Sequence, residues 1–114
     1  MSQERSVEKK SRKKELDYWR EIGDTSFKKG NYLAALEAYE TIARTDPQSV
    51  EAWKGMATAF SLLNLPYEAL ESLDNAADID PADQESLEIK ILILKKLLEE
   101  NQERLNQLKA DRKK

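Results

Sequence analysis

Apolar residues recur every three or four positions along most of the chain, which is the spacing of helices with one buried face. The first such run begins with Leu16 and Trp19 and stops at Gly30. Glycine suits the end of a helix because it adopts the left-handed backbone conformation without steric cost. The pattern therefore predicts two helices joined by a tight turn, over about 15–29 and 32–43.

A second helical hairpin follows with the same plan and a different turn. Pro47 ends the first hairpin, because proline disfavours the helical conformation in the residue before it. In the second hairpin, Asn64 tolerates the left-handed region, and Pro66 suits the first position of a helix, where its missing N–H is not needed. We expect these two helices over about 50–63 and 66–79.

The two hairpins repeat each other at an offset of 34 residues. The identical pairs at this offset are Trp19/Trp53, Ala35/Ala69, Leu36/Leu70, Asp46/Asp80 and Pro47/Pro81. A fixed period of this length is typical of a solenoid of helix-turn-helix units. The pair resembles two consecutive tetratricopeptide repeats (TPRs), at 16–48 and 50–82. The resemblance implies an all-α fold, a right-handed α-α superhelix of two repeats capped by a long C-terminal helix.

The resemblance also assigns roles to small residues and suggests a function. In this family small residues let two helices approach closely, which here implies that Gly23 faces Ala35 and that Ala57 faces Ala69. Family members are non-enzymatic adaptors or scaffolds, and their activity is protein–protein interaction. The resemblance therefore implies a protein or peptide partner.

The C-terminal segment, 83–114, departs from the repeat. Neither Gly nor Pro occurs after Pro81, and Asp83 can cap a helix. We expect one helix of about 28 residues, roughly 40 Å long. Apolar residues in it alternate steps of four and three, with one Asn in the series, as in a coiled coil. This series, the heptad seam, is Leu87, Ile91, Leu94, Leu98, Asn101, Leu105 and Leu108.

The other side of the same helix is also apolar, with Ile89, Leu92, Ile93 and Leu97. One side can cover the second repeat, which leaves the other facing water. We expect a second copy of the chain, related by a two-fold axis, to cover it. The alternative is that the N-terminal arm or a bend of the helix covers it. The predicted association residues are Ile89, Leu92, Ile93, Leu97, Leu98, Asn101, Leu105 and Leu108.

The first helix of each repeat lines the concave groove in the resembling family. The partner-groove residues carried over are Asp17, Arg20, Asp24, Lys28, Glu51, Lys54, Thr58 and Leu62, with Glu21, Phe27, Ser61, Glu88, Ile89, Leu92 and Lys95 beside them.

Charge in this groove is mixed. Family members that bind a C-terminal carboxylate place Asn four residues after a Lys or Arg. Here the pairs are Arg20 with Asp24 and Lys54 with Thr58, so we do not expect that specificity. A peptide with both charge signs suits the groove. The alternative is a solvated helix face with pairs such as Arg20 and Asp24 at i,i+4.

The formal net charge of −3 is unevenly distributed. Residues 1–14 carry six Lys/Arg against two Glu (+4), 15–108 carry nine against nineteen acids (−10), and 109–114 carry four against one (+3). We expect 1–14 to be a basic N-terminal arm, flexible or frayed helix. It is either a solubilising tail or a contact for nucleic acid, for which interleaved aromatic residues are missing.

Several function classes are excluded by residue types. The chain has no Cys, no His and no Gly-rich phosphate loop, so we expect no catalytic site, cofactor or metal site. The acidic run 78–85 lacks the glycine of a calcium loop and is interpreted as a helix stop and start. No apolar leader or membrane-spanning window is present, and the absence of Cys favours the cytoplasm. The remaining alternatives are an oligomerisation module acting through 87–108 and a nucleic-acid accessory protein using its basic ends.

Overall fold

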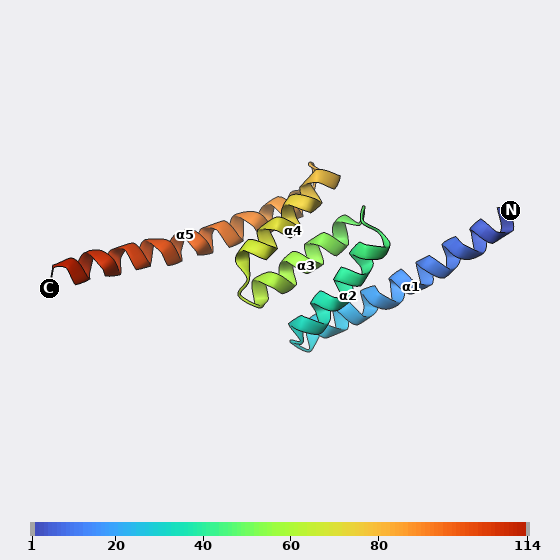
Figure 1. Cartoon of the computed structure of the whole chain (residues 1–114), viewed down its shortest axis with the longest axis horizontal. Coiled ribbons are helices and arrows are strands. Elements are labelled where there is room, and N and C mark those ends of the chain that lie inside the picture. The colour runs from blue at the N-terminus through green and yellow to red at the C-terminus, as the bar shows by residue number, and fades with distance from the viewer. Residues whose placement is uncertain (1, 114) are drawn as a thin grey trace.

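The computed structural model describes residues 2–113, and over this range the chain forms five α-helices and no strand. Met1 and Lys114, the outermost residues of the expected arm and C-terminal helix, lie outside the described residues. The molecule is elongated, 76 × 30 × 18 Å, and the free ends of the first and last helices point in opposite directions (Figure 1). The helices are α1 Ser2–Lys28, α2 Tyr32–Thr45, α3 Val50–Leu62, α4 Pro66–Ile79 and α5 Gln84–Arg112.

The turns within the two hairpins follow the expected chemistry. Gly30 and Asn64 both have a positive φ, +75° and +63°, so the left-handed residue predicted at each turn is confirmed. Asn31 caps α2 by accepting a hydrogen bond from the Ala34 N–H at 3.3 Å. Pro66 is the first residue of α4, where it breaks no hydrogen bond.

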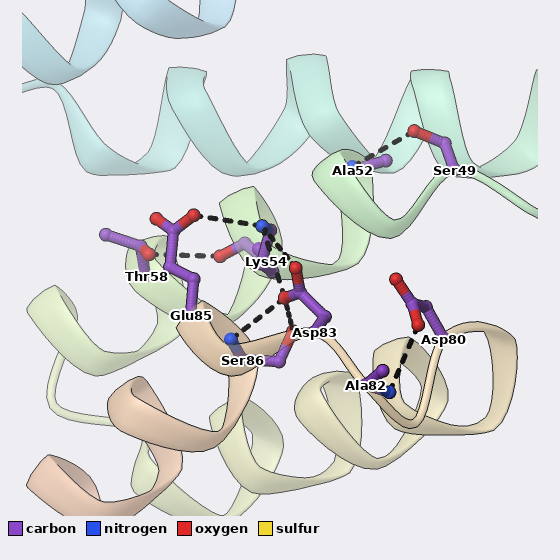
Figure 2. A network of polar contacts seen from close by, with 9 residues as sticks. All are labelled: Ser49, Ala52, Lys54, Thr58, Asp80, Ala82, Asp83, Glu85 and Ser86. Carbon is purple, nitrogen blue, oxygen red and sulfur yellow. Dashed lines mark hydrogen bonds and ion pairs between the residues drawn. The ribbon is translucent and has the colours of Figure 1, made fainter.

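The junctions between hairpins also repeat. Asp46 accepts a hydrogen bond from the Gln48 N–H, and Asp80 accepts the equivalent one from the Ala82 N–H. Asp83 caps α5 by accepting from the Ser86 N–H at 2.9 Å (Figure 2). The acidic run 78–85 is therefore a helix stop followed by a helix start, as expected.

α1 is longer than the sequence pattern predicts, since it begins at Ser2 rather than near residue 15. The described side chains from Ser6 to Glu15 are all exposed. Lys, Arg and Glu are good helix formers, and neither Gly nor Pro interrupts this segment. Local propensity therefore extends the helix beyond the part that packs, and of the two expected states of the arm the structure has the helical one.

Tyr39 is the centre of the first core cluster. Its ring lies between Gly23 of α1 and Gly55 of α3, where an added Cβ would come within 2.7 and 2.5 Å of it. Tyr39 is therefore the side chain nearest to Gly23, and the expected approach of Gly23 to Ala35 stays a prediction. Ile42 and Met56 complete the cluster around the ring. The two glycines allow α2 to lie close to α1 and α3 at once.

A second core cluster joins α3, α4 and α5. Ala57 and Ala69 are fully buried where α3 meets α4, and Leu73 is 2% exposed. Ile93 of α5 packs into this cluster and is 5% exposed. The first half of α5 is thus attached to the second hairpin, whereas its second half extends away from the other helices (Figure 1).

Candidate interaction surfaces

Ion pairs connect the first helix of each repeat to the next one. Arg20 of α1 bonds Glu51 of α3 at 3.1 Å, and Lys54 of α3 bonds Glu85 of α5 at 2.9 Å. Arg20 and Lys54 are equivalent at the 34-residue offset, as are Glu51 and Glu85. Equivalent ion pairs therefore form between α1 and α3 and between α3 and α5. They define a shared surface, the α1–α3–α5 face, which contains the sequence-predicted groove residues.

Lys54 is the most constrained charge on this face. It also contacts Asp83 at 3.2 Å, and its side chain is only 18% exposed (Figure 2). Burial alone would lower the pKa of Lys54, but its hydrogen bonds to Glu85 and Asp83 outweigh burial, so the pKa is raised. The pKa of Asp83 is lowered by hydrogen bonds from Ser86 and by Lys54. With two carboxylates beside it, Lys54 positions α5 and is not free to bind a ligand carboxylate.

Arg20 is likewise engaged, although it is more exposed. It bonds Asp17 at 2.8 Å as well as Glu51, and their effect on its pKa outweighs burial, so the pKa is raised. The expected i,i+4 pair with Asp24 does not form. Asp24 instead accepts a hydrogen bond from the Tyr39 hydroxyl.

Tyr39 holds its proton tightly in this arrangement. Burial and the hydrogen bond to Asp24 raise the pKa of Tyr39 well above its ordinary value. Phe27, a predicted groove neighbour, also packs against the Tyr39 ring at 5.7 Å between centroids. Phe27 therefore belongs partly to the core and offers little surface to a ligand.

The exposed leucines among the predicted groove residues lie on α3 and α5. Leu62 is 50% exposed and Leu92 is 66% exposed. Thr58 is half-buried, and its hydroxyl donates to the Lys54 carbonyl at 3.0 Å. The remaining predicted groove side chains that are exposed are Asp17, Glu21, Asp24, Lys28, Glu51, Glu88 and Lys95, while Ser61 is half-buried.

The apolar residues of α5 divide between two sides. Ile89, Ile93 and Leu97 pack against Ala57, Ala69 and Leu73. These three residues are part of the chain's own core, which corrects their assignment to the association surface.

The heptad seam lies on the uncovered side of α5. Asn101 donates a hydrogen bond to the Leu97 carbonyl at 2.7 Å and is exposed like the rest. Of the predicted association residues, Leu92, Leu98, Asn101, Leu105 and Leu108 are therefore accessible. The exposed fractions of the apolar seam residues are Leu87 59%, Ile91 43%, Leu94 45%, Leu98 68%, Leu105 45% and Leu108 57%.

The basic arm borders a separate cleft of about 490 Å³ between α1 and the end of α2. Lys9, Arg12 and Lys13 line it together with Asp17 and Asp46. The cations of the arm thus share this cleft with carboxylates of the same chain.

Among the side chains described, those of residues 6–113, no group of three Asp, Glu, His or Cys is placed to hold a metal ion. No helix in this range is both long and apolar enough to cross a membrane.

Comparison with known proteins identifies the fold. No family model and no curated protein matches the chain. Among solved structures it is similar to the C-terminal TPR-containing domain of a Plasmodium falciparum protein described as FK506-binding, with a TM-score of 0.72. The match covers 82% of this chain and 62% of that one at 21% identity, so it concerns the fold alone. The predicted fold is confirmed: the protein is an all-α, TPR-like helical repeat of two motifs and a capping helix.

Proposed function

We propose that the protein is a non-enzymatic adaptor that binds a peptide or helix of a partner protein along the α1–α3–α5 face. The repeated ion pairs, Arg20 with Glu51 and Lys54 with Glu85, support this because they fix the three helices relative to one another. A preorganised surface binds at a lower entropic cost than a mobile one.

The observation that carries the proposal is the exposure of Leu62 and Leu92 on this face. Arg20 and Lys54, the cations at the positions with which members of the resembling family bind a carboxylate, already bond carboxylates of the chain. Exposed leucines beside satisfied charges favour a partner segment that contributes apolar side chains. We therefore expect an amphipathic segment and no requirement for a free C-terminus.

Panning a displayed peptide library on the full chain, followed by calorimetric titration of the selected peptides, tests this proposal. Leu62→Asp and Leu92→Asp should each weaken binding by about tenfold or more, since each places a charge in an apolar contact. Leu33→Asp is the matched control, because Leu33 is 64% exposed on α2. Peptides that bind all three variants equally well, or a library that yields no binder, would contradict the proposal.

A further inference from the structure

The heptad seam of α5 is equivalent to the sides of α1 and α3 that are covered by the second helix of each hairpin, α2 and α4. Gly23 of α1, Ala57 of α3 and Ile91 of α5 are equivalent at the 34-residue offset. Gly23 packs on Tyr39 of α2, and Ala57 packs with Leu73 of α4. Ile91, by contrast, is 43% exposed. The side of α5 that the second helix of a third hairpin would cover is therefore exposed in the single chain.

The turn within each hairpin determines the chain direction of its second helix. Three-residue turns join α1 to α2 and α3 to α4, so each second helix runs antiparallel to the first (Figure 1). A helix of a second copy is not joined to α5 by a turn, so its direction is determined by the charges beside the seam.

Residue size distinguishes this contact from the two hairpins. The hairpins have small residues at this position, Gly23 and Ala57, whereas α5 has Ile91. A β-branched residue such as Ile91, flanked by the leucines Leu87 and Leu94, is typical of a coiled-coil seam. The occupant therefore packs at coiled-coil distance and not as a repeat helix does.

The length of the seam also limits what can cover it. It runs from Leu87 to Leu108, about 32 Å, and every described side chain after Leu97 is exposed. A matching occupant is a helix of similar length with its own heptad seam, and α5 itself has both properties. We propose that α5 pairs with α5 of a second copy as an antiparallel two-stranded coiled coil. This inference does not rest on the proposed function of the α1–α3–α5 face.

Charges beside the seam favour one register. With the two-fold axis between positions 99 and 100, Leu98 faces Asn101 of the second copy and Ile91 faces Leu108. The flanking positions then bring Glu88 next to Lys109 of the second copy, and Lys90 next to Asp111. Two-fold symmetry repeats both pairs, which gives four attractive contacts between copies. Lys90 already bonds Asp74 at 2.9 Å in its own chain, so Glu88 with Lys109 is the more informative pair.

Other arrangements place like charges together. A parallel pair brings Lys90 next to Lys95 and Arg104 next to Lys109 of the second copy. A shift of the antiparallel pair by one heptad in one direction places Lys95 next to Lys95 of the second copy. A shift in the other direction places Arg104 next to Arg104 of the second copy. The proposed register avoids all of these contacts.

The mass of the chain in solution, by sedimentation equilibrium at tens of micromolar, tests whether a second copy binds. We expect twice the 13.1 kDa of one chain. Leu98→Asp should give a monomer, and Leu92→Asp should leave the dimer intact, because these leucines are 68% and 66% exposed on different sides of α5. A wild-type monomer, including one whose seam is covered by a different protein, would overturn the proposal. Far-UV circular dichroism verifies that each variant is folded.

Charge exchange tests the antiparallel register. Glu88→Lys and Lys109→Glu should each raise the dimer dissociation constant by about fivefold, and the double variant should restore it. In a parallel pair Lys109→Glu would strengthen the dimer, because it removes the like-charge contact with Arg104, and this result would overturn the register.

Failure of this inference is separable from failure of the proposed function. The Leu98→Asp monomer should bind the selected peptides as the wild type does, and the Leu92→Asp dimer should bind them about tenfold or more weakly.

Discussion

α1 and α5 each pack one half against the central helices and extend the other half away from them (Figure 1). They have similar lengths, 27 and 29 residues, and the described side chains of both free halves are exposed. In the free part of α1, between residues 6 and 15, Val7 is the one apolar residue. The free half of α5 instead carries Leu98, Leu105 and Leu108 at coiled-coil spacing. Two helices with the same placement thus differ in what they present to solvent.

This difference separates two properties that are often treated as one. Helix formation in both free halves follows from local propensity, since both are rich in Lys, Glu, Gln and Arg. The tendency to bind another helix depends on a continuous apolar stripe, which only α5 has. We therefore expect α1 to end in solvent and α5 to end in an interface.

The attachment of α5 depends most on Ile93. Ile93→Ala should destabilise the chain by about 2–4 kcal/mol, because it leaves a cavity between α5 and the second hairpin. Leu105→Ala is the control and should change stability by less than about 0.5 kcal/mol in dilute solution, where the single chain prevails. Urea unfolding followed by tryptophan fluorescence measures both. Equal effects would mean that the two halves of α5 are packed alike.

The attachment of α1 depends on Gly23. Gly23→Ala should cost about 1–3 kcal/mol, because its Cβ would lie 2.7 Å from the Tyr39 ring, which Gly55 prevents from moving aside. Alanine is the better helix former, so a stabilised variant would show that the ring is free to shift. The control is Thr25→Ala, which changes an exposed position of the same helix. Thermal unfolding by circular dichroism measures the difference.

The smallest expected effect concerns the Tyr39 hydroxyl. Tyr39→Phe removes its hydrogen bond to Asp24 and should cost about 1 kcal/mol at neutral pH. Because the pKa of Tyr39 is raised in the folded chain, this contribution is complete below the ordinary tyrosine pKa and is lost as pH rises above about 10. The stabilities of the wild type and Tyr39→Phe should therefore converge at alkaline pH. Tyr67→Phe, at a side chain that is 69% exposed, is the control and should follow the wild type throughout.

The sequence pattern located four helices and their turns closely. Local signals at Gly30, Asn64 and Pro66 determine where these helices begin and end, and such signals are read directly from residue types. The start of α1 was missed because the pattern relied on apolar spacing, and 2–15 forms helix without it.

The candidate surfaces were harder to predict because they depend on packing. Apolar periodicity shows two apolar sides of α5 but not which one contacts the second hairpin. The repeat offset contains this information, since Ile89 is equivalent to Gly55, which faces Tyr39 of the preceding helix. In the same way, the pair of Arg20 with Glu51 spans 31 residues and cannot be inferred from spacing along one helix.

The position of the Tyr39 ring between two glycines has a consequence for folding cooperativity. Helical repeats can in principle unfold one at a time, because each unit contacts only its neighbours. Here one side chain of α2 fills the space between α1 and α3, so removing any one of these helices leaves a cavity for the other two. We therefore expect the first hairpin and the start of the second to open in a single event, so that the backbone amides packed around Tyr39 in all three helices share one free energy of hydrogen exchange.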